Sequence, residues 1–111
     1  MNETDKIKIE VLTEGSGDKA TNGTRVEVDY TGELTDGTVF DSSIPSGKPF
    51  TFILGRGDVI RGWDIGVLNM QISETRKLTI QHELAYGEDG YPGVIPPRAT
   101  LVFTVTLRGV N

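Results

Sequence analysis

A chain of 111 residues can enclose one hydrophobic core but not two, so we expect a single domain over residues 1–111. Its 16 acidic and 11 basic side chains leave a formal net charge of −5, which argues against binding to nucleic acid or to anionic membranes. The absence of cysteine excludes disulfides and thiol catalysis, and the single histidine, His82, excludes a metal site built from several histidines.

The start of the chain is polar and acidic, and no apolar segment follows it. The sequence shows neither a signal peptide nor a stretch that is long and apolar enough to span a membrane. We therefore expect a cytoplasmic protein.

The first predicted strand covers residues 6–12, where apolar and charged side chains alternate. Alternation of this kind predicts a strand with one buried face. The side chains expected on that face are Ile7, Ile9 and Val11. A glycine-rich turn over residues 14–18 follows the strand.

The next two strands are expected to form a hairpin. Residues 24–34 alternate again, and the dipeptide Asp36-Gly37 favours a tight turn before the short run 38–40. The inward side chains of the longer strand are Val26, Val28 and Tyr30. A polar loop over 41–49 comes next, and strand character resumes over 50–54.

A short helix is predicted over residues 59–70, because apolar side chains recur at helical spacing. The residues on that face are Ile60, Trp63 and Val67. Gly62 and Gly66 each weaken a helix by roughly 1 kcal/mol relative to alanine, so this helix must pack against the strands. Periodicity alone leaves two interpretations of Trp63 open: a side chain that fills the core, or the floor of an aromatic pocket.

Two more strands, over 74–82 and 100–108, flank a long loop over residues 84–97. Long loops in small domains are usually functional. This loop carries prolines, two tyrosines and apolar residues with no strand partner, which suits a rigid binding rim. The whole pattern predicts an α+β domain with about five antiparallel strands wrapped over one helix.

No conventional reaction centre is visible. A Ser-His-Asp set cannot be assembled around His82, which we expect to be structural. Residues 55–58 resemble a phosphate-binding loop only superficially, and we regard their Arg-Gly-Asp triplet as a coincidence. Glu83, Glu88 and Asp89 are expected to be a solvated surface, so no metal site is predicted.

Aromatic and aliphatic side chains that could converge are a stronger signal. They are Tyr30, Phe40, Phe50, Val59, Ile60, Trp63, Tyr86, Ile95 and Phe103. The alternative is that all of them are core residues, and this is weakest for Tyr86 and Ile95, which lie in the long loop.

Five stretches occur in a recognisable order: Val28-Asp29-Tyr30-Thr31-Gly32, Phe40-Asp41-Ser42-Ser43, Val59-Ile60-Arg61-Gly62-Trp63, Ala85-Tyr86-Gly87 and Gly93-Val94-Ile95-Pro96-Pro97. They resemble the FKBP family, the immunophilin peptidyl-prolyl cis-trans isomerases that bind tacrolimus and rapamycin. The resemblance extends from about Lys6 to Arg108.

The resemblance implies a five- to six-stranded antiparallel sheet around one short α-helix, with the pocket between them and no cofactor or metal. It implies catalytic roles for Tyr30, Asp41, Trp63, Tyr86 and Phe103. It implies contacts with substrate or macrolide for Phe40, Phe50, Asp58, Val59, Ile60, Tyr91 and Ile95. The Ile60 N–H and the Tyr86 hydroxyl would donate hydrogen bonds to ligand carbonyls, and Trp63 would form the floor.

The implied partners are proline-containing peptides and proteins, tacrolimus and rapamycin, and calcineurin or the rapamycin-target kinase through the drug. We expect a monomer.

The chain departs from the common family pattern at Tyr91, at Asp58 and in the 44–47 loop. A non-catalytic module that docks proline loops in the same pocket is the alternative. A purely structural domain would leave the apolar residues of the long loop unexplained.

Overall fold

In the computed structural model, which describes residues 3–111, the central strand of the sheet is β3 (Arg25–Leu34). One edge of β3 pairs with β8 (Leu101–Val110). The other edge pairs with β4 (Val39–Ser42) near one end and with β5 (Phe50–Ile53) near the other. The predicted alternation is confirmed, since Val26 and Val28 of β3 are fully buried.

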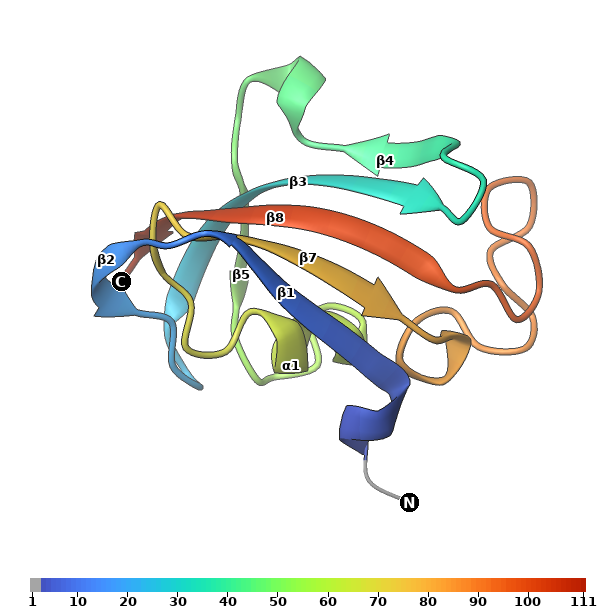
Figure 1. Cartoon of the computed structure of the whole chain (residues 1–111), viewed down its shortest axis with the longest axis horizontal. Helices are drawn as coiled ribbons and strands as arrows, with labels where there is room; N and C mark the ends of the chain where they lie inside the picture. Colours follow the sequence, from blue (N-terminus) through green and yellow to red (C-terminus); the bar gives the residue numbers. More distant parts are fainter. Residues whose placement is uncertain (1–2) are drawn as a thin grey trace.

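The main sheet has six strands, all antiparallel, in the order β1-β7-β8-β3-β4 with β5 also on β3. On the far side of β8 lie β7 (Thr75–Ile80) and then the edge strand β1 (Ile7–Thr13). Figure 1 shows β1, β7, β8 and β3 arching over α1 (Arg61–Gly66), the one α-helix in the described part of the chain. This arrangement confirms the predicted α+β fold.

The predicted hairpin between β3 and β4 is confirmed. The Gly37 N–H donates to the Leu34 carbonyl at 2.9 Å, and the Leu34 N–H donates to the Thr38 carbonyl at 2.8 Å. Asp36 Oδ1 accepts the Thr38 N–H at 2.9 Å. Gly37 has a φ of +91°, a conformation in which a side chain would be strained.

Helix α1 (Arg61–Gly66) is shorter than the predicted 59–70 and lies very close to β7. A β-carbon at Gly62 would lie 2.6 Å from Ile80 Cγ2, and one at Gly66 would lie 2.6 Å from Leu78 Cδ1. The two glycines therefore weaken the isolated helix but allow it to approach the sheet, where burial stabilises it.

The turn predicted over residues 14–18 is wrong in part, because Ser16–Lys19 forms strand β2. Its partner is β6 (Gln71–Ile72), far away in the sequence, in a separate two-stranded sheet. The Gln71 Nε2 amide donates to the Gly17 carbonyl at 3.1 Å. The pairing comes from this distant partner, so the local Ser-Gly-Asp-Lys sequence gives no sign of it.

The predicted burial of β1 is also wrong in part. Ile9 is 41% exposed and Val11 is 52% exposed, and only Ile7 packs against the core. Strand β1 is the edge of the sheet, and although α1 touches both β1 and β7, its closest packing, at Gly62 and Gly66, is against Ile80 and Leu78 of β7. The six-residue helix therefore covers only part of the edge strand, and Ile9 and Val11 stay exposed.

The remaining elements are three 3-10 helices: η1 (Glu3–Lys6), η2 (Ile44–Ser46) and η3 (His82–Leu84). Helix η2 lies within the predicted polar loop, and η3 begins the long loop before β8. None of the helices within residues 3–111 is long and apolar enough to cross a membrane.

Candidate active site

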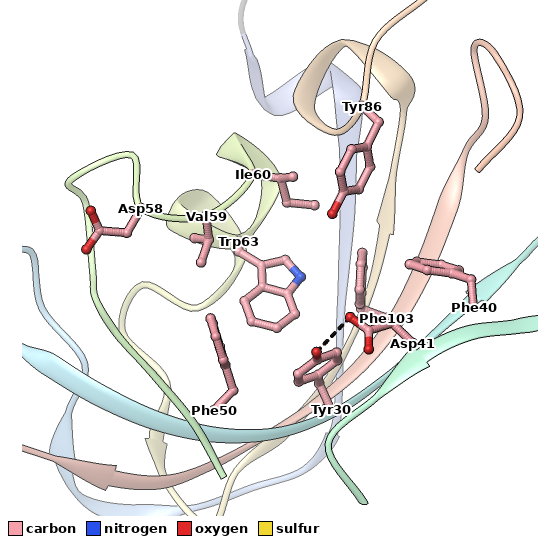
Figure 2. Close-up of a pocket in the computed structure, with 10 residues that line it drawn as sticks. All are labelled: Tyr30, Phe40, Asp41, Phe50, Asp58, Val59, Ile60, Trp63, Tyr86 and Phe103. Carbon is pink, nitrogen blue, oxygen red and sulfur yellow. Dashed lines mark hydrogen bonds between the residues drawn. The ribbon is translucent and has the colours of Figure 1, made fainter. Parts of the chain in front are cut away.

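A cavity of about 240 Å³ opens between α1 and the sheet, and side chains from many separate segments line it (Figure 2). The lining residues are Tyr30, Phe40, Asp41, Phe50, Asp58, Val59, Ile60, Trp63, Tyr86 and Phe103. Ten of the twelve residues that the sequence predicts for the site are thus brought together. Tyr91 and Ile95 are outside this lining.

Trp63 lies at the centre of the aromatic cluster, as Figure 2 shows. Its ring centroid is 4.8 Å from that of Tyr30 and 5.3 Å from that of Phe103, and both pairs meet edge to face. Phe50 and Phe52 also pack against the indole, with centroids at 6.0 and 5.7 Å. Only 5% of Trp63 is exposed. It therefore belongs to the core and to the cavity floor, so the two interpretations of this residue are both correct.

Gly32 of β3 allows two of the rings to approach each other. A β-carbon at this position would lie 2.7 Å from Phe103 Cε1 and 2.7 Å from Phe40 Cζ. The rings of Phe40 and Phe103 meet edge to face with centroids 5.5 Å apart, directly over the glycine. Only glycine leaves room for this pair.

The Tyr30 hydroxyl donates a hydrogen bond of 2.7 Å to Asp41 Oδ2, drawn as a dashed line in Figure 2. Burial, together with this bond and the negative charge of Asp41, raises the pKa of the Tyr30 phenol well above its usual value. The hydroxyl therefore stays protonated, and it holds the carboxylate of Asp41 against the wall of the cavity.

The segment before α1 is fastened to the helix by a buried carboxylate. Asp64 accepts hydrogen bonds from the N–H groups of Gly55 and Gly57 at 2.9 and 3.0 Å, and it is only 4% exposed. This anchor precedes the residues of the segment that reach the cavity. The Ile60 N–H makes no hydrogen bond within residues 3–111, so it is free to donate to a ligand.

Tyr86 follows η3 and directs its hydroxyl into the cavity (Figure 2). Burial, the charge of Asp41 and then Tyr91 raise the pKa of this phenol, so it too remains a hydrogen-bond donor at neutral pH. The ring of Tyr91 stacks on that of Tyr86, with a centroid distance of 6.2 Å and an angle of 19°.

Ile95 has a different environment from the exposed rim that the sequence predicts. It is only 4% exposed and packs in the core. Its N–H and carbonyl exchange hydrogen bonds of 2.8 Å with the carbonyl and N–H of Tyr91. The expectation that this loop residue lacks a partner is wrong, because the loop folds back on itself and supplies one.

The acidic and histidine side chains considered in the sequence lie outside the cavity lining. Glu83 pairs with Lys6 Nζ at 3.2 Å and with His82 Nδ1 at 3.4 Å. A hydrogen bond from its own backbone, followed by the one from Lys6, holds the pKa of Glu83 below its usual value. These contacts give His82 and Glu83 a structural role at the start of η3.

Sequence reasoning missed three residues that shape the site: Gly32, Phe52 and Asp64. Each acts on residues that are distant in the chain or lie behind the lining, so no local pattern distinguishes it. Asp64 of α1 is the easiest of the three to find from the sequence, because a carboxylate on the buried side of a helix needs hydrogen-bond donors. That reasoning finds Asp64 but does not identify Gly55 and Gly57 as its partners.

Comparison with known proteins gives one family. Residues 17–108 match the model of the FKBP-type peptidyl-prolyl cis-trans isomerases. The chain is 52% identical to FK506-binding protein 1 of Dictyostelium discoideum over 91% of its own length and 94% of the relative. It is 49% identical to the peptidyl-prolyl cis-trans isomerase Fkbp12 of Drosophila melanogaster, over 93% and 98% of the two chains.

A third relative is the peptidyl-prolyl cis-trans isomerase FPR2 of Saccharomyces cerevisiae. It is 59% identical over 84% of this chain and 70% of its own. The chain also spans 27% of the length of two longer curated relatives. The matches to short relatives thus cover nearly all of both chains, and the matches to longer ones cover one part of them.

Proposed function

The chain belongs to the FKBP-type peptidyl-prolyl cis-trans isomerase family, and from this premise we propose that the cavity floored by Trp63 is where it acts. The protein is a peptidyl-prolyl cis-trans isomerase, as its named relatives are. The observation that carries the proposal is an apolar, aromatic cavity with two free hydrogen-bond donors at its edge, the Ile60 N–H and the Tyr86 hydroxyl.

The chemistry requires no nucleophile. Rotation about an Xaa-Pro bond breaks amide resonance, and the barrier is roughly 18–20 kcal/mol. Because no covalent bond is made or broken, a catalyst needs only to bind the twisted amide more tightly than the planar one. Each factor of ten in rate requires about 1.4 kcal/mol of such preference.

The aromatic lining favours the twisted amide by removing the water that solvates the planar amide. The planar amide is the more charge-separated form and is better solvated by water, so a dry aromatic surface removes part of its advantage. A cavity of about 240 Å³ is below the roughly 300–1,000 Å³ that is typical for drug-sized ligands. It suits a single pyrrolidine ring seated on Trp63.

The polar groups then hold the peptide in place. We assign the Ile60 N–H and the Tyr86 hydroxyl to carbonyl groups on either side of the proline. Asp41, fixed by Tyr30, contributes a negative potential at the wall of the cavity. Phe103 and the remaining lining residues exclude water.

We propose that the same cavity receives one ring-sized part of tacrolimus (FK506) and of rapamycin, since relatives such as FK506-binding protein 1 of Dictyostelium discoideum carry FK506 binding in their names. Drug-dependent complexes with calcineurin or the rapamycin-target kinase stay predictions, as do the monomeric state and the cytoplasmic location. Co-precipitation with and without drug, light scattering and microscopy of a tagged chain test these in turn.

The family match over residues 17–108 and one continuous core support a single isomerase domain over 1–111.

The deciding experiment measures cis-to-trans exchange of a Leu-Pro-Phe peptide by NMR, with and without rapamycin. Catalysis that the drug abolishes would support both the reaction and the site. Drug binding without catalysis would instead favour a docking module for proline loops.

Two variants connect the reaction to the cavity. We expect Phe103→Tyr and Asp41→Val to lower kcat/KM while the chain still folds, because both change the cavity wall. Asp18→Val is the matched control, since it makes the same exchange at an exposed residue of β2 outside the lining. Unchanged kcat/KM in both cavity variants would contradict the assignment of the reaction to this cavity.

A further inference from the structure

Tyr91 and Ile95 are the two predicted site residues that do not line the cavity, yet they are connected to it through Tyr86. The rings of Tyr86 and Tyr91 are stacked at 6.2 Å and 19°. Tyr91 in turn exchanges two backbone hydrogen bonds of 2.8 Å with Ile95, which is buried. A continuous series of contacts thus extends from the core to the edge of the cavity.

Tyr91 is held firmly although it is 56% exposed. The Val94 N–H donates to the Tyr91 carbonyl at 2.9 Å, and Gly93 has a φ of +81°. A turn with proline in its second position and a glycine of positive φ in its third is of type II. Proline restricts the backbone, and the buried Ile95 fixes the other strand of the bridge, so the Tyr91 ring stands on a rigid base.

Tyr86 needs such a support. It is 40% exposed, and its hydroxyl makes no hydrogen bond in the part of the chain that the structure describes. Tyr91 is the aromatic neighbour that packs on its ring there. Within residues 3–111, ring packing and no polar contact is thus available to orient a hydroxyl that has to meet a substrate carbonyl in hydrogen-bond geometry.

We propose that Tyr91 is a positioning residue for the isomerase reaction: it acts through Tyr86 by stacking on its ring and aiming its hydroxyl into the cavity. This inference rests on the proposed function, because it needs Tyr86 to donate to the substrate. The buried Ile95 serves the same end one step further away, by holding Tyr91. The backbone bonds between Tyr91 and Ile95 do not depend on the Tyr91 side chain, so removing the ring leaves the bridge in place.

The test is a double-mutant cycle on kcat/KM with the Leu-Pro-Phe peptide. We expect Tyr91→Ala to lower kcat/KM about two- to tenfold, the range that corresponds to one aromatic pair. Tyr91→Phe keeps the ring and should restore the activity of the original chain. In a Tyr86→Phe background, Tyr91→Ala should have almost no further effect, because the hydroxyl that it aims is gone.

Val94→Ala is the matched control, since Val94 is exposed on the same turn and outside the cavity lining. It should leave kcat/KM unchanged. Thermal unfolding of every variant checks whether the fold is intact. A Tyr91→Ala loss that persists in full without the Tyr86 hydroxyl would mean that Tyr91 contacts the substrate itself, which overturns the inference. So would a neutral Tyr91→Ala beside an impaired Tyr86→Phe, with the proposed function intact. A neutral Tyr86→Phe would contradict the role proposed for Tyr86 and this inference with it.

Discussion

Single atoms decide how the rings of the cavity meet, and Gly32 is the clearest case. Its missing β-carbon leaves the space in which Phe40 and Phe103 make their edge-to-face contact. The glycine also interrupts a strand, where it costs stability relative to a residue with a side chain. We infer that β3 accepts this cost because the cavity needs both rings.

Gly32→Ala should therefore lower kcat/KM by at least tenfold, since the new methyl group forces Phe40 or Phe103 out of place. Gly109→Ala is the matched control in β8, where the nearest neighbour of the added carbon is Glu27 Oε1 at 3.3 Å. Peptide exchange rates for the two variants measure the difference. Equal rates would show that the position of these rings is unimportant.

Tyr30 gives the protein a pH dependence at the alkaline end. Its pKa is raised in the folded state, so above about pH 10 the unfolded chain loses a proton that the folded chain keeps. The free energy of unfolding should consequently fall as the pH rises through this range. In Tyr30→Phe the fall should be smaller. Urea unfolding at several alkaline pH values measures both slopes, and identical slopes would contradict this account.

At the scale of elements, α1 and β7 show how context reverses a helix propensity. On an exposed helix, replacing glycine by alanine stabilises by about 1 kcal/mol. At Gly62 the added carbon would overlap Ile80, so Gly62→Ala should destabilise the protein.

Removing the opposing side chain tests this explanation. In an Ile80→Ala background the space is open, and Gly62→Ala should become neutral or stabilising. Chemical denaturation of the four proteins gives the coupling free energy. The same change in stability in both backgrounds would show that close packing is not the reason for the glycine.

The elements that the sequence predicts well are those whose burial follows from local alternation. Residues 25–34 and 101–110 form the two longest strands, and Val26 and Val28 of the first are buried as predicted. The exposure of Ile9 and Val11 could not be predicted, because alternation identifies a face of the strand and does not say whether another layer covers that face. Strand β2 could not be predicted either, because its pairing comes from β6.

The site follows the same rule. Tyr30, Trp63 and Phe103 are found from spacing and composition. The family resemblance then adds Asp41, Asp58 and Tyr91. The resemblance implies ligand contacts for Tyr91 and Ile95 as well, and so does not separate the residues that line the cavity from those that support it. Tyr91 and Ile95 differ from the other ten because a backbone bridge and a ring stack, both formed by folding of the loop, place them in the second group.

For the whole molecule, charge should influence which peptides are turned over. The lining of the cavity includes the carboxylates of Asp41 and Asp58 and no basic side chain. Asp58 is paired with Arg56 at 3.9 Å, whereas Asp41 has no ion pair within residues 3–111. The net charge of −5 has the same sign.

Peptides with lysine beside the proline should therefore have a higher kcat/KM than the same peptides with glutamate, by about threefold or more at low salt. The difference should shrink as ionic strength rises and screens the charges. Exchange rates for a Lys-Pro and Glu-Pro pair at two salt concentrations measure both effects. A ratio near one at low salt would mean that the carboxylates do not reach the peptide.

The position of β1 at the edge of the sheet has a consequence for how the protein fluctuates. This strand is paired along one side only, whereas β3 and β8, which carry Tyr30 and Phe103, are paired along both. Local unfolding starts where few buried contacts hold a segment, so β1 opens in brief excursions while the inner strands stay closed. We therefore expect its amide protons to exchange with deuterium quickly, and those of β3 and β8 to exchange only when the whole chain unfolds, which hydrogen-exchange NMR measures. Tyr30 and Phe103, the two lining residues on those inner strands, should therefore keep their places while the first strand frays.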